Sequence, residues 1–248
     1  MPLNRGMTES QSSTPQSWRP HDFDHQHGDV SGGWLRAATF GAMDGLVSNT
    51  ALIAGVGAAA DAHTVVISGF AGLVAGAFSM ALGEFASVTT ANEQIESEVT
   101  VEKRAFRLHP QAEQAELTDM FVNIGLSPET AAKAADEMHQ DESRAVNFHL
   151  TQELGVDPED KPSPYVAAGS SFIMFAVGAI VPLIPYLLGF RSLWLGLAFG
   201  GVGLLIAGGV AARFTKKPLW FASLRQLLFG TIAIAATYLV GHLVGTVV

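Results

Sequence analysis

The stretch TFGAMDGLVSNTALIAG, residues 39–55, places a single carboxylate, Asp44, in an otherwise uncharged run. From Ala37 to Gly83 the only other Asp, Glu, Lys or Arg is Asp61. A transmembrane helix needs about 20 predominantly apolar residues, and this window is long enough for two. The stretch therefore predicts a membrane-spanning helix that carries an acid at membrane depth.

Three further windows have no Asp, Glu, Lys or Arg: residues 162–190, 192–212 and 226–248. They are continuously apolar, whereas the strands of a membrane β-barrel alternate over about 10 residues. Only 15% of all residues are charged, and the chain has no cysteine, which excludes disulfides and thiolate metal ligands. We predict an all-α membrane protein with five transmembrane helices, at about 34–60, 65–90, 164–188, 192–212 and 221–247.

The region between the second and third predicted spans is polar and reads as soluble helices. The second span continues without a Gly or Pro break into the helix-forming run that begins at Asn92, and further helices are expected at 110–124, 127–139 and 141–154. Residues 1–33 are rich in Ser, Gln, Pro and His and predict a disordered tail. We divide the chain into a disordered polar tail (1–33), transmembrane helices 1–2 (34–91), a soluble helical domain (92–163) and transmembrane helices 3–5 (164–248).

Lysine and arginine are concentrated in the tail, in the soluble domain and in the loop after the fourth span. The short turn after the first span has neither residue, and the turn after the third has only Arg191. Because cytoplasmic loops carry the excess of basic residues, the N-terminus and the soluble domain are expected in the cytosol. The host membrane would be the plasma membrane in a bacterium and the membrane of an organelle in a eukaryote.

Asp44 and Glu84 are acids at membrane depth, each of which costs about 2.5 to 3.5 kcal/mol on insertion scales. Such residues usually face a bundle interior or an aqueous path, so an ion or proton path is the leading hypothesis. The alternative is a structural hydrogen bond, in which Asp44 caps a broken helix or pairs with a residue such as Asn49.

Met80 lies one helical turn before Glu84, on the same face of the second span. A methionine in an apolar helix is ordinarily a packing residue, but a thioether beside carboxylates is a mixed ligand set that suits a divalent transition ion. The pairs Gly41/Gly45 and Gly72/Gly76 are each spaced for close helix packing. We expect them to bring the first two spans together, with Asp44 near Met80.

The soluble region 91–163 has 16 acidic and 6 basic residues. A solvated acidic face is the ordinary explanation. However, three pairs have the spacing of one helix face, and together they can converge on a cation as in carboxylate sites of helix bundles. The pairs are Glu98/Glu102, Glu113/Glu116 and His149/Glu153.

The tail segment HDFDHQHGD, residues 21–29, offers a weaker metal-binding candidate. Its histidines are His21, His25 and His27. A His-rich tract can bind metal, although a flexible polar tail is the simpler interpretation.

Four motifs together resemble the vacuolar iron transporter family: MDGLVSNTALIAGV (43–56), AGAFSMALGEFASV (75–88), the Glu-rich insert that follows, and SSFIMFAVGAIVPLIPYLL (170–188). The resemblance covers essentially everything from Trp34 onward. It implies a five-span homodimer with the ion path at the subunit interface. It also implies that the soluble insert is a cytosolic metal-binding domain.

The same resemblance implies roles for single residues. Asp44 and Met80 match the membrane ion-binding pair, and Glu84 matches the acid of a GE(Y/F)xS motif. The matching carboxylates of the metal-binding domain are Glu102, Glu113, Glu116 and Glu153. Two positions depart from the pattern: Ala105 stands where a second glutamate is expected, and His149 with Leu150 replaces a methionine pair. An imidazole and fewer carboxylates should change affinity or ion preference.

We therefore expect a transporter rather than an enzyme, exporting Fe²⁺ from the cytosol in exchange for protons. Mn²⁺, Co²⁺ and Zn²⁺ are further candidate ions, and the expected partners are the bilayer and a second copy of the chain, with no nucleic acid. The rival hypotheses are a membrane-anchored ferroxidase and a metal sensor that binds without translocating. Ferroxidase bundles typically use Glu-x-x-His pairs, which the soluble region lacks.

Overall fold

We describe a computed structural model of the chain, for residues 33–247 except 154, 156, 159 and 216. The predicted tail, with its three candidate histidines, lies outside the described residues apart from Gly33. All regular secondary structure in the described part is helical. The elements are α1 (Trp34–Gly57), α2 (Ala62–Leu108), α3 (Pro110–Asn123), α4 (Pro128–His139), α5 (Glu142–Glu153), α6 (Pro164–Ile180), the 3₁₀ turn η1 (Val181–Leu183), α7 (Ile184–Leu187), α8 (Leu193–Thr215) and α9 (Leu219–Val247).

Four helical segments of the described chain are long and apolar enough to cross a membrane. They are Ala62–Leu108, Pro164–Leu187, Leu193–Arg213 and Leu219–Thr246. The first helix, α1, also has sufficient length with 24 residues, but it is not one of these segments, and its sequence contains the polar residues Asp44 and Asn49. It packs against α2, α6, α8 and α9, so these polar groups lie among protein neighbours. A membrane crossing by α1 stays a prediction.

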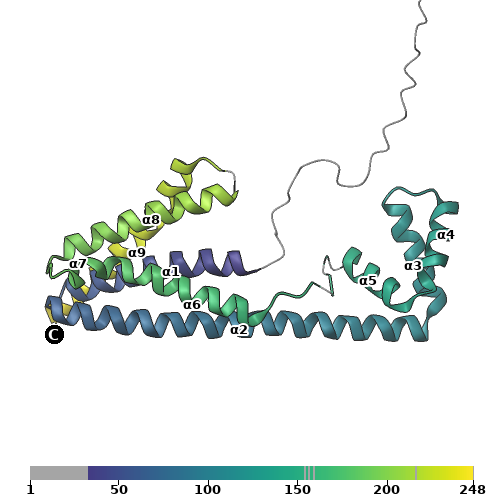
Figure 1. The fold of residues 1–248 in the computed structure, drawn as a ribbon, viewed down its shortest axis with the longest axis horizontal. Helices are drawn as coiled ribbons and strands as arrows, with labels where there is room; N and C mark the ends of the chain where they lie inside the picture. Colours follow the sequence, from purple (N-terminus) through teal and green to yellow (C-terminus); the bar gives the residue numbers. More distant parts are fainter. Residues whose placement is uncertain (1–32, 154, 156, 159, 216, 248) are drawn as a thin grey trace, which may run out of the picture. The chain divides into compact units, whose positions relative to one another are not determined.

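Helix α2 is a single helix of 47 residues, as the unbroken sequence predicts. At a rise of about 1.5 Å per residue it is about 70 Å long, more than twice the thickness of a hydrocarbon core. Its first turn is capped by Asp61, whose carboxylate accepts a 2.9 Å hydrogen bond from the backbone N–H of Thr64. Figure 1 shows α2 running from the apolar helices to α3, α4 and α5. One continuous helix therefore carries Met80 and Glu84, two of the three membrane candidates, as well as Glu102.

Two prolines interrupt the helix that follows the soluble region. The α-helical part of this span, α6, ends at Ile180, and the chain continues through the 3₁₀ turn around Pro182 into the short helix α7. Both Pro182 and Pro185 are fully buried. The interruption therefore faces protein rather than lipid, where neighbouring helices can satisfy the freed carbonyls.

The glycines of α1 approach a different helix from the one expected. A Cβ on Gly41 would lie 2.7 Å from the carbonyl oxygen of Ser171, and a Cβ on Gly45 would overlap the backbone of Phe175. Both contacts are with α6, and α1 and α6 form the most extensive helix pair in the described chain. The prediction that these two glycines bring α1 and α2 together was therefore wrong. On α2, the space beside Gly72 is filled by Leu52 and Asn49 of α1, so one glycine of the second pair does serve that contact.

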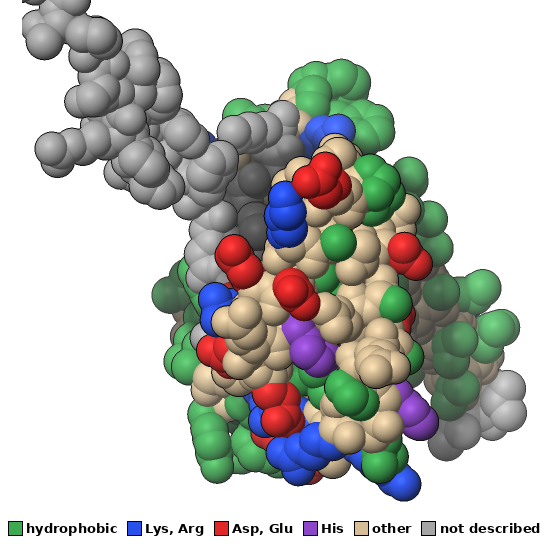
Figure 2. All heavy atoms as spheres, turned by 90° about the vertical axis from the view of Figure 1, so that its right-hand side faces the viewer, with side chains coloured by type: hydrophobic (Ala, Val, Ile, Leu, Met, Phe, Trp, Pro, Cys, Tyr) green, Lys and Arg blue, Asp and Glu red, His purple; other side chains and the backbone are tan. Residues whose placement is uncertain are grey.

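Helices α3 to α5 pack with the end of α2 around a small apolar core. Ser127 caps α4 and Pro128 occupies its first turn, with the N–H of Thr130 donating to the Ser127 hydroxyl. The core residues are Phe106, Leu117, Phe121, Ala131, Ala135, Ala145, Val146 and Leu150. Figure 2 looks onto this end of the molecule, where side chains of both charges are spread over the surface.

Candidate functional site

Asp44 and Met80 line the same cavity, of about 230 Å³, between α1, α2 and α6. Both side chains are half-buried. The other polar residues of the wall are Ser48, Asn49 and Ser79. Asp44 and Met80 are therefore close to each other, as expected, although the glycines of α1 do not make the contact with α2.

Asp44 does not pair with Asn49 in the described structure. The Asn49 amide nitrogen instead donates a 2.5 Å hydrogen bond to the backbone carbonyl of Ala179, on α6. Asn49 is 2% exposed, and its amide oxygen accepts no hydrogen bond from the described residues. Sequence reasoning considered Asn49 only as a partner for Asp44, and it missed this unpartnered oxygen in the cavity wall.

Glu84 lies further along α2 and forms an ion pair with Arg36 of α1. The guanidinium and the carboxylate are 2.5 Å apart, and the side chains are 67% and 10% exposed, respectively. The sequence did not predict this pair, because the two residues are 48 positions apart. A basic side chain therefore neutralises the carboxylate proposed for the ion path, and this basic side chain is itself largely exposed.

A larger cavity, of about 740 Å³, lies between α1, α6 and α8 on another face of the bundle. Its wall is apolar and contains no carboxylate, imidazole or amide side chain. Thioethers alone are soft ligands that do not suit Fe²⁺ or Mn²⁺. Size alone therefore does not identify the ion site, and the smaller cavity at Asp44 has the appropriate chemistry.

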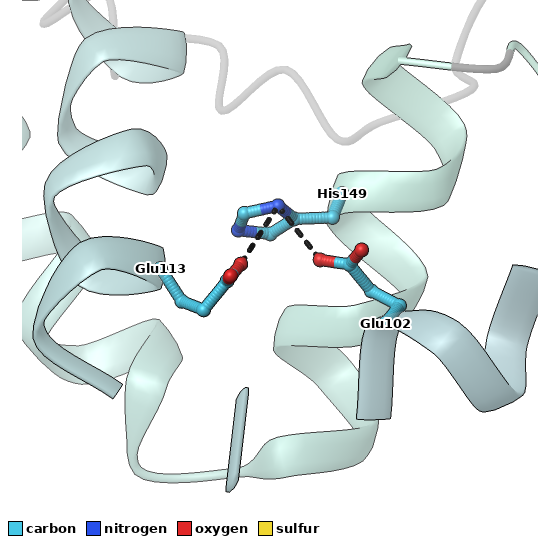
Figure 3. A group of neighbouring side chains, drawn as sticks. All are labelled: Glu102, Glu113 and His149. Atoms are coloured by element: carbon cyan, nitrogen blue, oxygen red, sulfur yellow. Dashed lines mark ion pairs between the residues drawn. The ribbon is translucent and has the colours of Figure 1, made fainter. Parts of the chain in front are cut away.

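A second group of candidate ligands meets where α2, α3 and α5 converge. The Nδ1 atom of His149 lies 3.1 Å from a carboxylate oxygen of Glu102 and 3.8 Å from one of Glu113. Figure 3 shows the two carboxylates pointing at the same side of the imidazole ring. His149 is fully buried, and one ligand atom from each of the three residues lies within 4.8 Å of the others.

His149 also belongs to a second triad of the same size, with Glu116 and Glu153. Burial first, and then the negative charges of neighbouring glutamates, raise the pKa of Glu102 and of Glu153 to about 7 each. Burial raises the pKa of Glu113 and lowers that of His149. The imidazole of His149 is therefore neutral and does not offset the negative charges of the glutamates around it. A bound cation would supply that positive charge and would stabilise the ionised glutamates.

The buried polar atoms of this group, which we call the glutamate–histidine cluster (Glu102, Glu113, Glu116, His149 and Glu153), fit a divalent cation. Both ring nitrogens of His149 and one oxygen of Glu102 have no hydrogen-bond partner among the described residues. Buried polar atoms are normally satisfied, so unpaired ones facing each other need an explanation. Imidazole nitrogen with carboxylate oxygen is a ligand set that suits Fe²⁺, Zn²⁺ and Mn²⁺.

Among the described candidates, Glu98 is not part of this cluster. Glu98 belongs to neither triad within the described chain, although it lies one turn before Glu102. Leu150 packs in the apolar core, so only His149 of the pair that replaces two methionines faces the carboxylates. The tail histidines fall outside the described residues. Sequence reasoning missed His139, whose ring stacks on Phe106 beside His149 and whose Nδ1 is buried without a partner.

Comparison with known proteins gives a consistent result. The sequence model of the VIT family matches residues 35–242. The chain is 34% identical over 220 residues to "Vacuolar iron transporter homolog 1" of Arabidopsis thaliana, which covers 86% of this chain and 84% of that protein. It is 32% identical over 219 residues to "Vacuolar iron transporter" of Acanthamoeba castellanii, covering 85% and 78%. It is also 32% identical over 216 residues to "VIT-like transporter 1b" of Glycine max, covering 86% and 76%.

Proposed function

The chain belongs to the vacuolar iron transporter family of integral membrane metal-ion transporters, and we propose that it exports Fe²⁺ from the cytosol in exchange for protons. The observation that carries this proposal is the cavity that Asp44 and Met80 share among the membrane helices. A carboxylate there replaces part of the hydration of the ion, and the thioether favours Fe²⁺ over Mg²⁺. Mn²⁺, Co²⁺ and Zn²⁺ are further candidate substrates.

Proton exchange follows from competition for the same carboxylate. A proton that reaches Asp44 from the far side of the membrane removes the negative charge that holds the cation, so the ion is released there. Glu84 takes part only when Arg36 moves away, because their ion pair otherwise occupies the carboxylate. We propose that an arriving cation displaces the exposed guanidinium.

We propose that α1 also crosses the membrane, which gives five spans together with the four apolar segments. Two copies of the chain then form a dimer with Asp44 near its two-fold axis. Residues 92–163 form the cytosolic metal-binding domain, and the glutamate–histidine cluster collects ions before transport. Support for this role comes from the two triads and from the unpartnered atoms of His149. In this orientation the N-terminus is cytosolic, and the host membrane is a plasma membrane or a vacuole-like membrane.

Flux in proteoliposomes tests the proposal. Wild-type protein should load the vesicles with Fe²⁺ while the lumenal pH changes in the direction of proton countertransport. The variant Asp44→Asn keeps the side-chain volume but removes the charge, and flux should fall about 10- to 100-fold, as for loss of one interaction with a charged group. Asp119→Asn, at an exposed position of α3, is the matched control and should transport normally. Unimpaired flux through Asp44→Asn would exclude this mechanism.

A second candidate function is oxidation of Fe²⁺ at the cytosolic domain. The glutamate–histidine cluster, with one histidine and four glutamates, favours such an oxidation, although the soluble region lacks Glu-x-x-His pairs. Oxygen consumption by the purified full-length protein on addition of Fe²⁺ would support this function. Flux without oxygen consumption would support transport alone.

A further inference from the structure

Asn49 is held in one orientation by the break in α6. Its amide nitrogen donates to the carbonyl oxygen of Ala179, which lies in the last turn of α6 just before the 3₁₀ turn at Pro182. The last carbonyls of an α-helix have no intrahelical donor, so this hydrogen bond fills a position that the helix end leaves open. Because only the NH₂ end of the amide can donate, the oxygen end must point the other way.

The oxygen end of Asn49 faces the Asp44 cavity. Asn49 lines that cavity together with Asp44 and Met80. A Cβ on Gly72 would lie 3.3 Å from the amide oxygen, so the glycine on α2 keeps the space beside this oxygen open. At 2% exposure and with no donor among the described residues, the oxygen is a buried acceptor without a partner. A buried acceptor left unpaired costs about 1 to 3 kcal/mol, which a bound cation would offset.

We propose that the amide oxygen of Asn49 is a third protein ligand of the transported cation and that it sets the ion selectivity of the membrane site. This inference rests on the proposed function, because it assigns a ligand to the same cavity. The amide oxygen is a hard donor, and carbonyl-type oxygens suit Mn²⁺ better than soft, low-coordinate ions. It also carries no proton that could leave or arrive, so protonation of Asp44 does not change the charge of this amide oxygen.

A purely structural role for Asn49 makes a different prediction. In that case Asn49 only ties α1 to α6, and its loss would lower stability and the maximal rate for every ion equally. A ligand role changes the relative KM values of different ions. The two roles can therefore be separated by comparing ions in one variant, and by a replacement that restores an oxygen without restoring the hydrogen bond to Ala179.

The test compares Asn49→Leu and Asn49→Asp with wild-type protein in proteoliposomes. Asn49→Leu removes the oxygen at similar volume, and the KM for Mn²⁺ should rise about tenfold, with a smaller rise for Zn²⁺. Asn49→Asp cannot donate to Ala179 while ionised but offers oxygen ligands, so it should recover Mn²⁺ affinity and release the ion more slowly. Thr50→Val is the matched control, because Thr50 is buried next in sequence and its hydroxyl bonds within α1 to Leu46.

An equal change in KM for all ions in Asn49→Leu, or Asn49→Asp behaving like Asn49→Leu, would overturn the inference. Failure of Asp44→Asn to reduce flux would instead overturn the proposed function. Metal-dependent thermal shifts of the detergent-solubilised full-length variants provide a readout that needs no flux. They are measured in proteins that also carry Glu102→Gln and His149→Ala. Because His149 belongs to both triads, neither triad of the cytosolic cluster is then complete. There Mn²⁺ should stabilise the protein with Asn49 more than the protein with Asn49→Leu, and equal shifts would contradict the ligand role.

Discussion

Replacing Glu102 by glutamine should stabilise the metal-free helices α3 to α5 at pH 8, although it removes a candidate ligand. Burial and the charges of Glu113 and Glu153 raise the pKa of Glu102 to about 7, from an ordinary value of 4.5. The folded state therefore holds a proton that the unfolded chain releases. The stability associated with this proton is fully present below pH 4.5 and is lost as the pH rises through 7. Glutamine imitates the protonated form at every pH.

The change in the free energy of unfolding can be worked out from the raised pKa of Glu102. About 2.5 pKa units correspond to about 3.4 kcal/mol at 1.36 kcal/mol per unit. Solvent reaches part of this side chain, which is 14% exposed, and the neighbouring glutamates share the same protons. We therefore expect about 1 to 2 kcal/mol of stabilisation at pH 8 and none at pH 4. A cation bound at pH 8 should stabilise the wild-type helices more than the variant.

Hydrogen exchange of residues 92–153 in the full-length protein measures this local stability. Protection of α3 and α5 should be about 5- to 30-fold higher in Glu102→Gln than in wild-type protein at pH 8 without metal. Glu93→Gln is the matched control, since Glu93 is exposed on the same helix and should change nothing. Lower protection in Glu102→Gln at pH 8, or a wild-type stability that rises from pH 5 to pH 8, would refute the reasoning.

The other predictions concern three separate contacts. Arg36→Gln frees the carboxylate of Glu84 and should lower the KM for Fe²⁺ at low ionic strength; an unchanged KM in flux assays would contradict this. His149→Met should weaken Zn²⁺ binding to the cytosolic cluster at least about tenfold by calorimetry. Gly45→Val forces a side chain into the backbone of α6 and should lower the thermal unfolding temperature, whereas Gly83→Val, which meets no neighbour, should not.

The positions of the helices could be predicted because the signals are local. Uncharged windows, the Ser127–Pro128 start and the prolines after α6 each act within a few residues, and the structure has helices where they indicate. The partner of a helix face is not a local property. Gly41 and Gly45 have the spacing for close packing with any helix, and nothing in their sequence favours α2 over α6.

The same distinction applies to the candidate sites. The spacing of Glu113 with Glu116 and of His149 with Glu153 identified faces that converge. The spacing did not show that His149 would belong to both triads, or that Glu98 would belong to neither. Arg36 could not be assigned to Glu84, because an ion pair between distant residues depends on how two helices align. The orientation of Asn49 depends on a carbonyl in another helix, which no spacing within α1 encodes.

The separation of the two sites along α2 limits what the cytosolic cluster can do for transport. Met80 and Glu102 are 22 positions apart on one helix, which is about 33 Å at 1.5 Å per residue. This is about four Debye lengths at physiological ionic strength, so the charge of the cluster neither guides an ion to Asp44 nor holds it there. Within one chain an ion must leave the cluster and diffuse through water. We therefore predict that loss of the cluster changes flux at low metal concentration but not the maximal rate, and that changes in the ligands around Asp44 alter the ion selectivity of transport.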